Sequence, residues 1–356
     1  MSHISQPVRD DQSLQSLWET FNPSQSSQAH NTPDAQEEKS ATQNGFYQWM
    51  GQYFESSVQA VHSFVVNRGG LAYLTGLMIV PSQFGLNVLE SKNTIQEAIQ
   101  QGKRNQIQIK PFNLELENGD TIGGVIYYPP NWKPADHSRC LLYHNPNGIT
   151  VAGYFENGKL SWAPKKFVQL EKCPLILYDY RGTGLSKDNL CASSIPFKPT
   201  YESVVVDGMN VLQYALKTFK HVDTYGSSLG GGVATVSLQR HLAKHDDFLR
   251  VTLLNHDSFT NTARVVLPNT HWLADSLGYV VGGTIHAEKS MKDLINRRIP
   301  ITILAHLKDP VIPQGARMVE SIEPLNARNV TIIKSNEYGH ANLSDDMFAQ
   351  LQRKQM

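Results

Sequence analysis

A serine, an aspartate and a histidine stand in three separate segments, in an order that could carry out acyl transfer. Ser228 is the central residue of a G-x-S-x-G pattern that spans residues 226–230, between a β-like run and a helix-like run. Asp309 directly follows an apolar run, and His340 lies in a short glycine-containing segment. Histidine titrates near neutrality, so it can take the serine proton, while an aspartate holds its tautomer. The three residues predict a nucleophilic serine activated by a histidine–aspartate pair.

Each of the three also has a purely structural interpretation. A serine between glycines can be a small turn residue, and His340 can be a solvated loop histidine. Asp309 can cap a turn or a helix, where aspartate is favoured. Asp257, at the end of another apolar run, is the alternative acid. We prefer Asp309 because the Pro-Val-Ile-Pro sequence after it fits the usual position of the acid. Ser227 is the alternative hydroxyl, although it is not central in the pattern.

An oxyanion hole needs two donors aimed at the oxygen that becomes negative. The backbone N–H of Leu229, directly after the nucleophile, is the first candidate. The second is expected from residues 144–148, His-Asn-Pro-Asn-Gly. Because proline has no N–H, Pro146 cannot donate. The remaining candidates are the backbone N–H groups of Asn145 and Asn147 or an asparagine side chain.

The elements that must position these residues follow from the apolar pattern. Short apolar runs alternate with helix-length segments after an antiparallel pair at 106–128, with a turn at 118–120. This alternation predicts an α/β fold with a mostly parallel sheet flanked by helices. Helices are expected over 201–219, 233–245, 314–322 and 344–353. Each catalytic candidate then lies in the segment that follows a strand.

Three regions are predicted along the chain. Residues 1–44 are polar and predict a disordered tail. Residues 45–104 have aromatic and apolar residues at helical spacing and predict a helical arm packed on the core. Residues 105–356 form the catalytic domain. The apolar segment 71–81 is too short to span a bilayer, so we expect a buried helix, with peripheral membrane contact as the alternative.

Composition excludes several classes of partner. Lys and Arg total 32, as do Asp and Glu, so the formal net charge is zero and nucleic acid is not an expected partner. Three cysteines without metal-like spacing favour a reducing compartment. His271 and His286 also lack ligand spacing, so neither a metal nor an organic cofactor is expected. The first forty residues hold no apolar core, so no cleavable signal peptide is predicted.

At these motifs the chain resembles the α/β-hydrolase superfamily. Besides the elements around Ser228, Asp309 and His340, residues 179–186 (Asp-Tyr-Arg-Gly-Thr-Gly-Leu-Ser) resemble the Asp-x-Arg-Gly-x-Gly-x-Ser turn common in that superfamily. The resemblance covers about residues 105–356 and implies a sheet of about eight strands. It also implies that Asp179 and Arg181 support loops rather than react.

The same resemblance implies a cap at about residues 258–296. Its apolar side chains are candidates for an acyl pocket, with helix packing as the alternative interpretation: Trp272, Leu277, Tyr279 and Val280. A small-molecule or lipid acyl ester or thioester is therefore the expected substrate. Peptidase activity and a catalytically silent interaction or membrane-docking module are the alternatives.

A narrower likeness concerns a bacterial group. The polar tail, the helical arm, residues 145–148 and residues 225–232 together resemble lipase-like SidB-type effectors of Legionella and the chlamydial 43 kDa protein family. That resemblance implies a protein delivered into a host cell.

Overall fold

The computed structural model describes residues 88–105, 107–117, 119–133, 138–156, 158–186, 201–266 and 285–355. The predicted tail, residues 45–87 of the predicted arm and residues 267–284 of the predicted cap lie outside the described residues. Of the predicted arm, helix α4 (Val88–Arg104) is described. It packs on β1 and on the short segments that follow β3.

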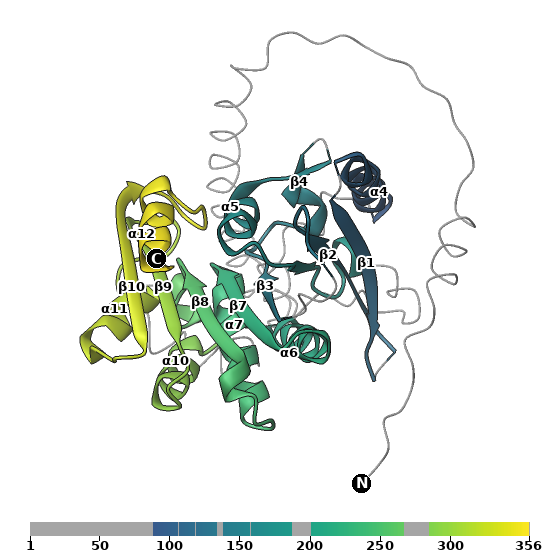
Figure 1. The fold of residues 1–356 in the computed structure, drawn as a ribbon. Helices are drawn as coiled ribbons and strands as arrows, with labels where there is room; N and C mark the ends of the chain where they lie inside the picture. Colours follow the sequence, from purple (N-terminus) through teal and green to yellow (C-terminus); the bar gives the residue numbers. More distant parts are fainter. Residues whose placement is uncertain are drawn as a thin grey trace, which may run out of the picture. The chain divides into compact units, whose positions relative to one another are not determined.

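An eight-stranded sheet runs through the described part of the chain (Figure 1). Its order is β1-β2-β6-β3-β7-β8-β9-β10. The hairpin β1/β2 is antiparallel, β2 pairs antiparallel with β6, and the remaining pairs are parallel. The strands are β1 (Gln108–Glu115), β2 (Thr121–Tyr128), β3 (Arg139–His144), β6 (Leu175–Tyr178), β7 (His221–Ser227), β8 (Val251–His256), β9 (Ile301–Lys308) and β10 (Val330–Tyr338). The short strands β4 (Phe155–Glu156) and β5 (Lys159–Leu160) form a separate pair.

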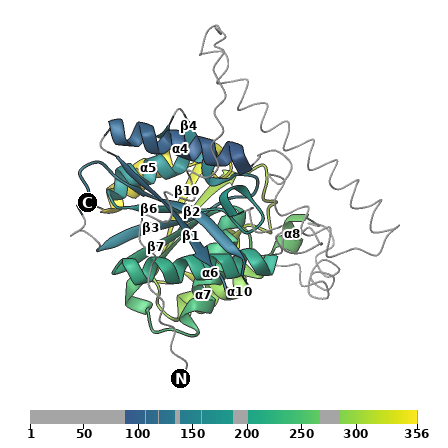
Figure 2. The same ribbon diagram turned by 90° about the vertical axis from the view of Figure 1, so that its right-hand side faces the viewer.

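Helices cover both faces of this sheet (Figure 2). One face carries α4, α5 (Trp162–Glu171) and α12 (Asp345–Gln355), and the other carries α6 (Tyr201–Thr218), α7 (Leu229–Leu242), α10 (Ala287–Asn296) and α11 (Met318–Ile322). Short helical turns complete the description: η3 (Val151–Tyr154), η4 (Gly184–Ser186), η6 (Phe248–Arg250), α8 (Thr262–Val266) and η7 (Glu323–Leu325). The predicted α/β architecture, with a mostly parallel sheet of eight strands between two helical layers, is confirmed.

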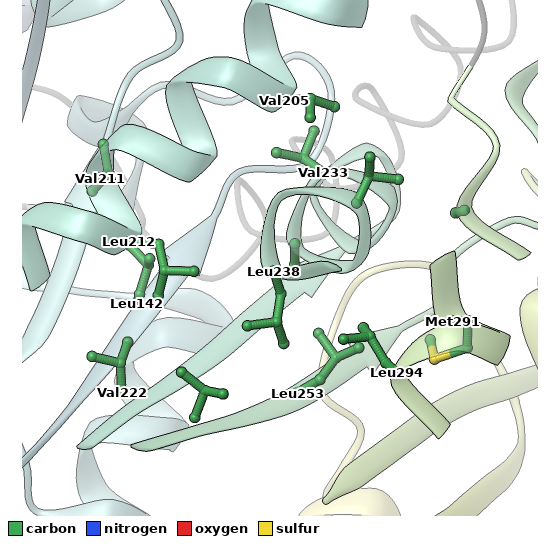
Figure 3. Close-up of a cluster of buried hydrophobic side chains, with 14 of the residues drawn as sticks. Leu142, Val205, Val211, Leu212, Val222, Val233, Leu238, Leu253, Met291 and Leu294 are labelled. Atoms are coloured by element: carbon green, nitrogen blue, oxygen red, sulfur yellow. The ribbon is translucent and has the colours of Figure 1, made fainter. Parts of the chain in front are cut away.

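Two apolar cores hold the layers together, one on each face of the sheet. Figure 3 shows part of the larger core, in which Leu142 and Leu253 from the sheet meet Leu212 from α6, Leu238 from α7 and Leu294 from α10. The central parallel strands bury both of their faces, which explains why their sequences are continuous apolar runs rather than alternating ones. Strand β7, which leads to Ser228, is buried in the same way along all but its first residue.

Helix α7 begins earlier than the sequence predicted. It starts at Leu229, directly after the turn, and not at Val233. Residues 230–232 are glycines, whose low helix propensity hides the true start of the helix.

No helix among the described residues is both long and apolar enough to cross a bilayer.

The parallel strands β3, β6, β7, β8, β9 and β10 all end at one edge of the sheet, which we call the carboxyl edge. The opposite edge, where these strands begin, is the amino edge. Catalytic and binding residues of open α/β sheets gather beyond the carboxyl ends of the strands.

Candidate active site

Ser228 lies in a strained turn at the carboxyl edge, between the end of β7 and the first residue of α7. Its backbone angles, φ 54° and ψ −119°, fall outside the regions that an L-residue adopts without cost. Two neighbours hold the turn in place. The Ser228 N–H donates to the His256 carbonyl at 2.9 Å, and the Ser258 hydroxyl donates to the Ser228 carbonyl at 3.2 Å. Strand β8 therefore supports the serine from one side.

The glycines of the G-x-S-x-G pattern are required by close backbone contacts. A Cβ on Gly226 would lie 2.0 Å from the carbonyl oxygen of Gly230. A Cβ on Gly230 would in turn lie 2.0 Å from the carbonyl oxygen of His144. The turn thus crosses over itself and presses against the end of β3, and no side chain fits at either position.

The structure joins Asp309 to His340. Asp309 follows β9, and its Oδ1 accepts hydrogen bonds from the backbone N–H groups of Val311 at 2.7 Å and Ile312 at 3.0 Å. Its Oδ2 accepts a hydrogen bond from His340 Nδ1 at 2.8 Å. The Asp309 side chain is 2% exposed and the His340 side chain 9%. With Nδ1 bound to the carboxylate, Nε2 is the ring nitrogen available for proton transfer.

The bond between the serine and the histidine is not formed. Within the ranges that the structure describes, no hydrogen bond joins the Ser228 hydroxyl to His340. Catalytic hydrogen bonds are often long without substrate and tighten only in the Michaelis complex. The Asp–His half of the predicted triad is present, and the Ser–His half is absent.

Asp257, the alternative acid, lies next to this pair but does not bond the imidazole of His340. Its Oδ2 accepts from His306 Nδ1 at 2.7 Å and from the Ala341 N–H at 2.9 Å, and its Oδ1 accepts from the His306 N–H at 2.7 Å. Burial acts to raise the pKa of Asp257, but the charge and hydrogen bond of His256, with the hydrogen bond of His306, hold it well below its usual range. Asp257 is a buried carboxylate that binds the loop after β10.

The sequence analysis missed His256 and His306. Both are fully buried, and His256 Nδ1 lies 2.8 Å from the Tyr225 hydroxyl. Their signal was present, since each is a histidine at or near the end of an apolar strand, where a buried polar residue needs a partner. The partner that they share is the Asp257 carboxylate, across β8 and β9.

The candidate oxyanion donors lie close together. Leu229 is the first residue of α7, where backbone N–H groups have no partner within the helix. The side-chain amide of Asn145 donates to the Tyr178 carbonyl at 2.8 Å, so the candidate donor of Asn145 is its backbone N–H. The Asn145 carbonyl would lie 2.7 Å from a Cβ on Gly230, which places this loop against the start of α7. Asn147 lies half-buried in the following turn.

The turn at residues 179–186 ties loops together beside the site. Asp179 accepts backbone hydrogen bonds from Val151 and Leu185, both at 2.8 Å. Its burial raises its pKa to about 7. Arg181 pairs with Asp207 at 2.6 Å and with Asp120 at 2.9 Å. Neither residue contacts Ser228, His340 or Asp309 through these bonds.

Two groups of side chains in the described part offer enough nitrogen and oxygen atoms to hold a metal ion. They are His256, Asp257 and His306, and Asp257, Asp309 and His340, with ligand atoms within 4.8 Å in each group. The short contacts inside both groups, 2.7 Å for His306 and 2.8 Å for His340, have the length of N–H···O hydrogen bonds. These bonds account for the arrangement without an ion. The predicted acyl-pocket residues lie outside the described residues: Trp272, Leu277, Tyr279 and Val280.

No protein-family model matches the sequence, and no curated protein matches it. Similar backbones occur among solved structures. An esterase from Pyrococcus furiosus is 12% identical, covers 71% of this chain and 90% of its own, and gives a TM-score of 0.46. The hyperthermophilic esterase from the archaeon Pyrobaculum calidifontis is also 12% identical, with 80% and 96% covered and a TM-score of 0.46. Brefeldin A esterase, a bacterial homologue of human hormone-sensitive lipase, is 11% identical, with 74% and 82% covered and a TM-score of 0.44.

These structural neighbours are esterases at low sequence identity, and likenesses of this degree say nothing about the activity of this chain. None of the three relates it to the effector groups of Legionella and Chlamydia, so that resemblance remains a prediction. Any assignment of activity therefore rests on the geometry at the carboxyl edge.

Proposed function

We propose that the protein is a serine hydrolase that cleaves acyl esters or thioesters through an acyl-enzyme at Ser228. One observation supports this above the others: a strained serine turn lies at the same sheet edge as the 2.8 Å bond between Asp309 and His340. Strain of this kind collects at functional sites, because structure elsewhere must maintain it. The hydrogen bonds between the strands of the sheet do not require either feature.

The proposed reaction has two halves. His340 Nε2 takes the proton from the Ser228 hydroxyl as its oxygen forms a bond to the substrate carbonyl carbon. The resulting oxyanion is stabilised by the Leu229 N–H and by a second donor from residues 145–147. As the carbonyl re-forms, the bond to the leaving alcohol or thiol breaks, and the imidazolium returns its proton to that group. Water then repeats the sequence, and the acid is released from Ser228.

Asp309 has a defined role in both halves. Its bond to His340 Nδ1 holds Nε2 unprotonated and aimed away from the carboxylate, and its charge stabilises the imidazolium that forms. Two backbone N–H bonds fix the carboxylate itself, so it cannot turn away from the ring. We propose an acyl chain as the substrate because Trp272, Leu277, Tyr279 and Val280 of the predicted cap are apolar candidates to line its pocket.

A catalytically silent fold is the second candidate, and a specific observation favours it. Within the described residues the Ser228 hydroxyl is not bonded to His340, and Pro146 removes a donor from the loop expected to complete the oxyanion hole. A silent protein would act as an interaction or membrane-docking module. The two candidates differ in whether Ser228 reacts.

The deciding experiment is labelling with a fluorophosphonate probe, together with hydrolysis of short- and long-chain p-nitrophenyl esters and thioesters. We expect the wild type to label and to turn over, and Ser228→Ala to lose both, by roughly 10⁴- to 10⁶-fold in kcat. Ser227→Ala is the matched control, because it removes the neighbouring hydroxyl and should still label. A folded wild type that neither labels nor hydrolyses any acyl substrate would favour the silent module, and peptide cleavage alone would favour a peptidase.

A further inference from the structure

We propose that Asp257 is a positioning residue of the site, whose carboxylate clamps the loop bearing His340 to strand β9 and aligns the imidazole with Ser228. This inference rests on the proposed function and adds to it a second carboxylate with a separate task. Asp309 orients the ring, whereas Asp257 holds the backbone that carries the ring.

The clamp is built from three hydrogen bonds. Oδ2 of Asp257 accepts the Ala341 N–H at 2.9 Å and His306 Nδ1 at 2.7 Å, and Oδ1 accepts the His306 backbone N–H at 2.7 Å. Ala341 directly follows His340 and has φ 57°, an unusual value for a residue with a side chain. Asp257 itself has φ 42°. Two residues with positive φ therefore meet at one hydrogen bond, which helps to hold both backbones in place.

A carboxylate is required at this position, and an amide cannot replace it. Both oxygens of Asp257 accept a backbone N–H, one from Ala341 and one from His306. An asparagine has one oxygen and one NH₂ group, so in either orientation its NH₂ would face a backbone donor. Because the site is 5% exposed, water cannot easily relieve that conflict. One of the two backbone groups would lose its partner.

The clamp also connects the histidine loop to the strand that ends in the nucleophile. His256 Nε2 lies 3.2 Å from Oδ2 of Asp257, and its Nδ1 lies 2.8 Å from the Tyr225 hydroxyl. The Ser227 hydroxyl donates to Tyr225 at 3.0 Å. A buried polar chain thus runs from β7 through β8 to β9 and the loop after β10. Displacement of Asp257 would shift the serine and the histidine relative to each other.

Asp257 also adds a negative charge beside the imidazole. The titratable groups that face it are His256 from β8, His306 from β9, and Asp309 and His340 from the loops after β9 and β10. Asp257→Asn removes this charge together with the clamp. A purely structural role would lower the amount of folded enzyme without lowering kcat per folded molecule.

The test compares Asp257→Asn with Asp223→Asn. Asp223 is a matched control, since it is 4% exposed, its pKa is also lowered, and it bonds Arg139 and Thr252 at the amino edge. We expect both variants to lose stability. For the folded enzyme, we expect kcat to fall roughly 100-fold with KM little changed in Asp257→Asn only, as for a misplaced catalytic group.

Hydrogen exchange of the Ala341 amide gives a second readout that does not need turnover. Asp257→Asn should accelerate this exchange, while Asp223→Asn should leave it at the wild-type rate. A wild-type kcat in Asp257→Asn or unchanged protection of Ala341 would each overturn the proposal. If the wild type itself shows no turnover, the proposed function fails, and the Ala341 exchange alone then decides whether the clamp exists.

Discussion

Two hydrogen-bonded aspartate–histidine pairs with the same N···O distance lie at opposite edges of the sheet. At the carboxyl edge His340 Nδ1 bonds Asp309 at 2.8 Å, and at the amino edge His241 Nε2 bonds Asp247 at 2.8 Å. The second pair lies at the end of α7, where Asp247 also pairs with Arg250 at 2.7 Å. Its function is to close the turn that leads into β8. A pair of this kind is therefore not by itself a catalytic feature.

What separates the two pairs is the backbone around them. At the amino edge, the positive φ angles of Lys172 (φ 50°, ψ 28°) and Asn326 (φ 44°, ψ 43°) belong to the C-terminal ends of helices and fall in the ordinary left-handed region. At the carboxyl edge, Ser228 has ψ −119°, outside that region, and it follows a fully buried strand. The start of a helix does not require this backbone conformation. The strain at Ser228 therefore marks the carboxyl edge as the place where chemistry is expected.

A hollow lies away from the candidate site. A hollow of about 840 Å³ opens at the amino edge, with Arg139, Lys159, Lys165 and Lys172 on its rim. No histidine is among the described residues that line it, so no hydroxyl or thiol group there has an imidazole base beside it. The two edges therefore differ in their polar groups: a serine, a histidine and an aspartate gather at the carboxyl edge, and basic side chains gather around the hollow.

The largest effect expected from this comparison is on turnover. Asp309→Asn should lower kcat by roughly 10⁴-fold, because an amide no longer holds the required tautomer of His340. Asp247→Asn removes the carboxylate that His241 bonds at the amino edge. It should lower the free energy of unfolding by about 1–2 kcal/mol without changing kcat/KM. Steady-state kinetics and urea denaturation of both variants measure this. Equal kinetic losses in the two variants would remove the distinction between the edges.

A smaller effect is expected on stability at the crossing of the serine turn and β3. Gly230→Ala places a methyl 2.0 Å from the His144 carbonyl oxygen, so it should destabilise the fold by roughly 3 kcal/mol or more. Gly153→Ala is the control, because the nearest atom to its new methyl would be the Ile149 Cγ2 at 3.3 Å, and we expect a change of about 1 kcal/mol or less. Urea unfolding compares them. Equal midpoints would show that the turn can relax, contrary to the close packing described.

The smallest effect concerns pH. Burial lowers the pKa of His144, at the end of β3, from 6.5 to about 3. Between these values the unfolded chain binds a proton that the folded imidazole does not, so the free energy of unfolding falls as pH falls, by about 1.4 kcal/mol per pH unit. His144→Gln should reduce the slope between pH 6.5 and about 5 relative to the wild type, because the other groups that titrate there, such as Asp179 and Asp207 with their raised pKa values, are the same in both proteins. Urea unfolding at both limits measures it, and identical slopes in variant and wild type would contradict the neutral, buried state of His144.

Much of the fold could be predicted because its signals are local. The apolar runs at β3, β6 and β7 predicted buried parallel strands, and the asparagine–glycine turn predicted the β1/β2 hairpin. The start of α7 could not be predicted, since glycines at 230–232 are poor helix formers and are needed there only for close contacts. The pairing of Asp309 with His340 follows from strand order, and the sequence already favoured Asp309 over Asp257.

The role of Asp257 was beyond sequence reasoning for a different reason. Its partners are backbone N–H groups, at Ala341 and His306, which every residue other than proline offers. The side-chain types in a sequence do not indicate which carboxylate accepts hydrogen bonds from backbone N–H groups. The register between β8 and β9 brings the Asp257 carboxylate within reach of these N–H groups.

Within the described ranges, strand β10 is the last strand of the sheet and pairs with β9 alone. Elements with few partners open locally at a lower free energy than the whole molecule. Since the loop after β10 carries His340, fraying of this strand would withdraw the proposed base while Ser228 remained in place. Heat or denaturant should therefore abolish the proposed activity at a lower temperature or concentration than the one that unfolds the core. The activity should return as soon as β10 pairs with β9 again.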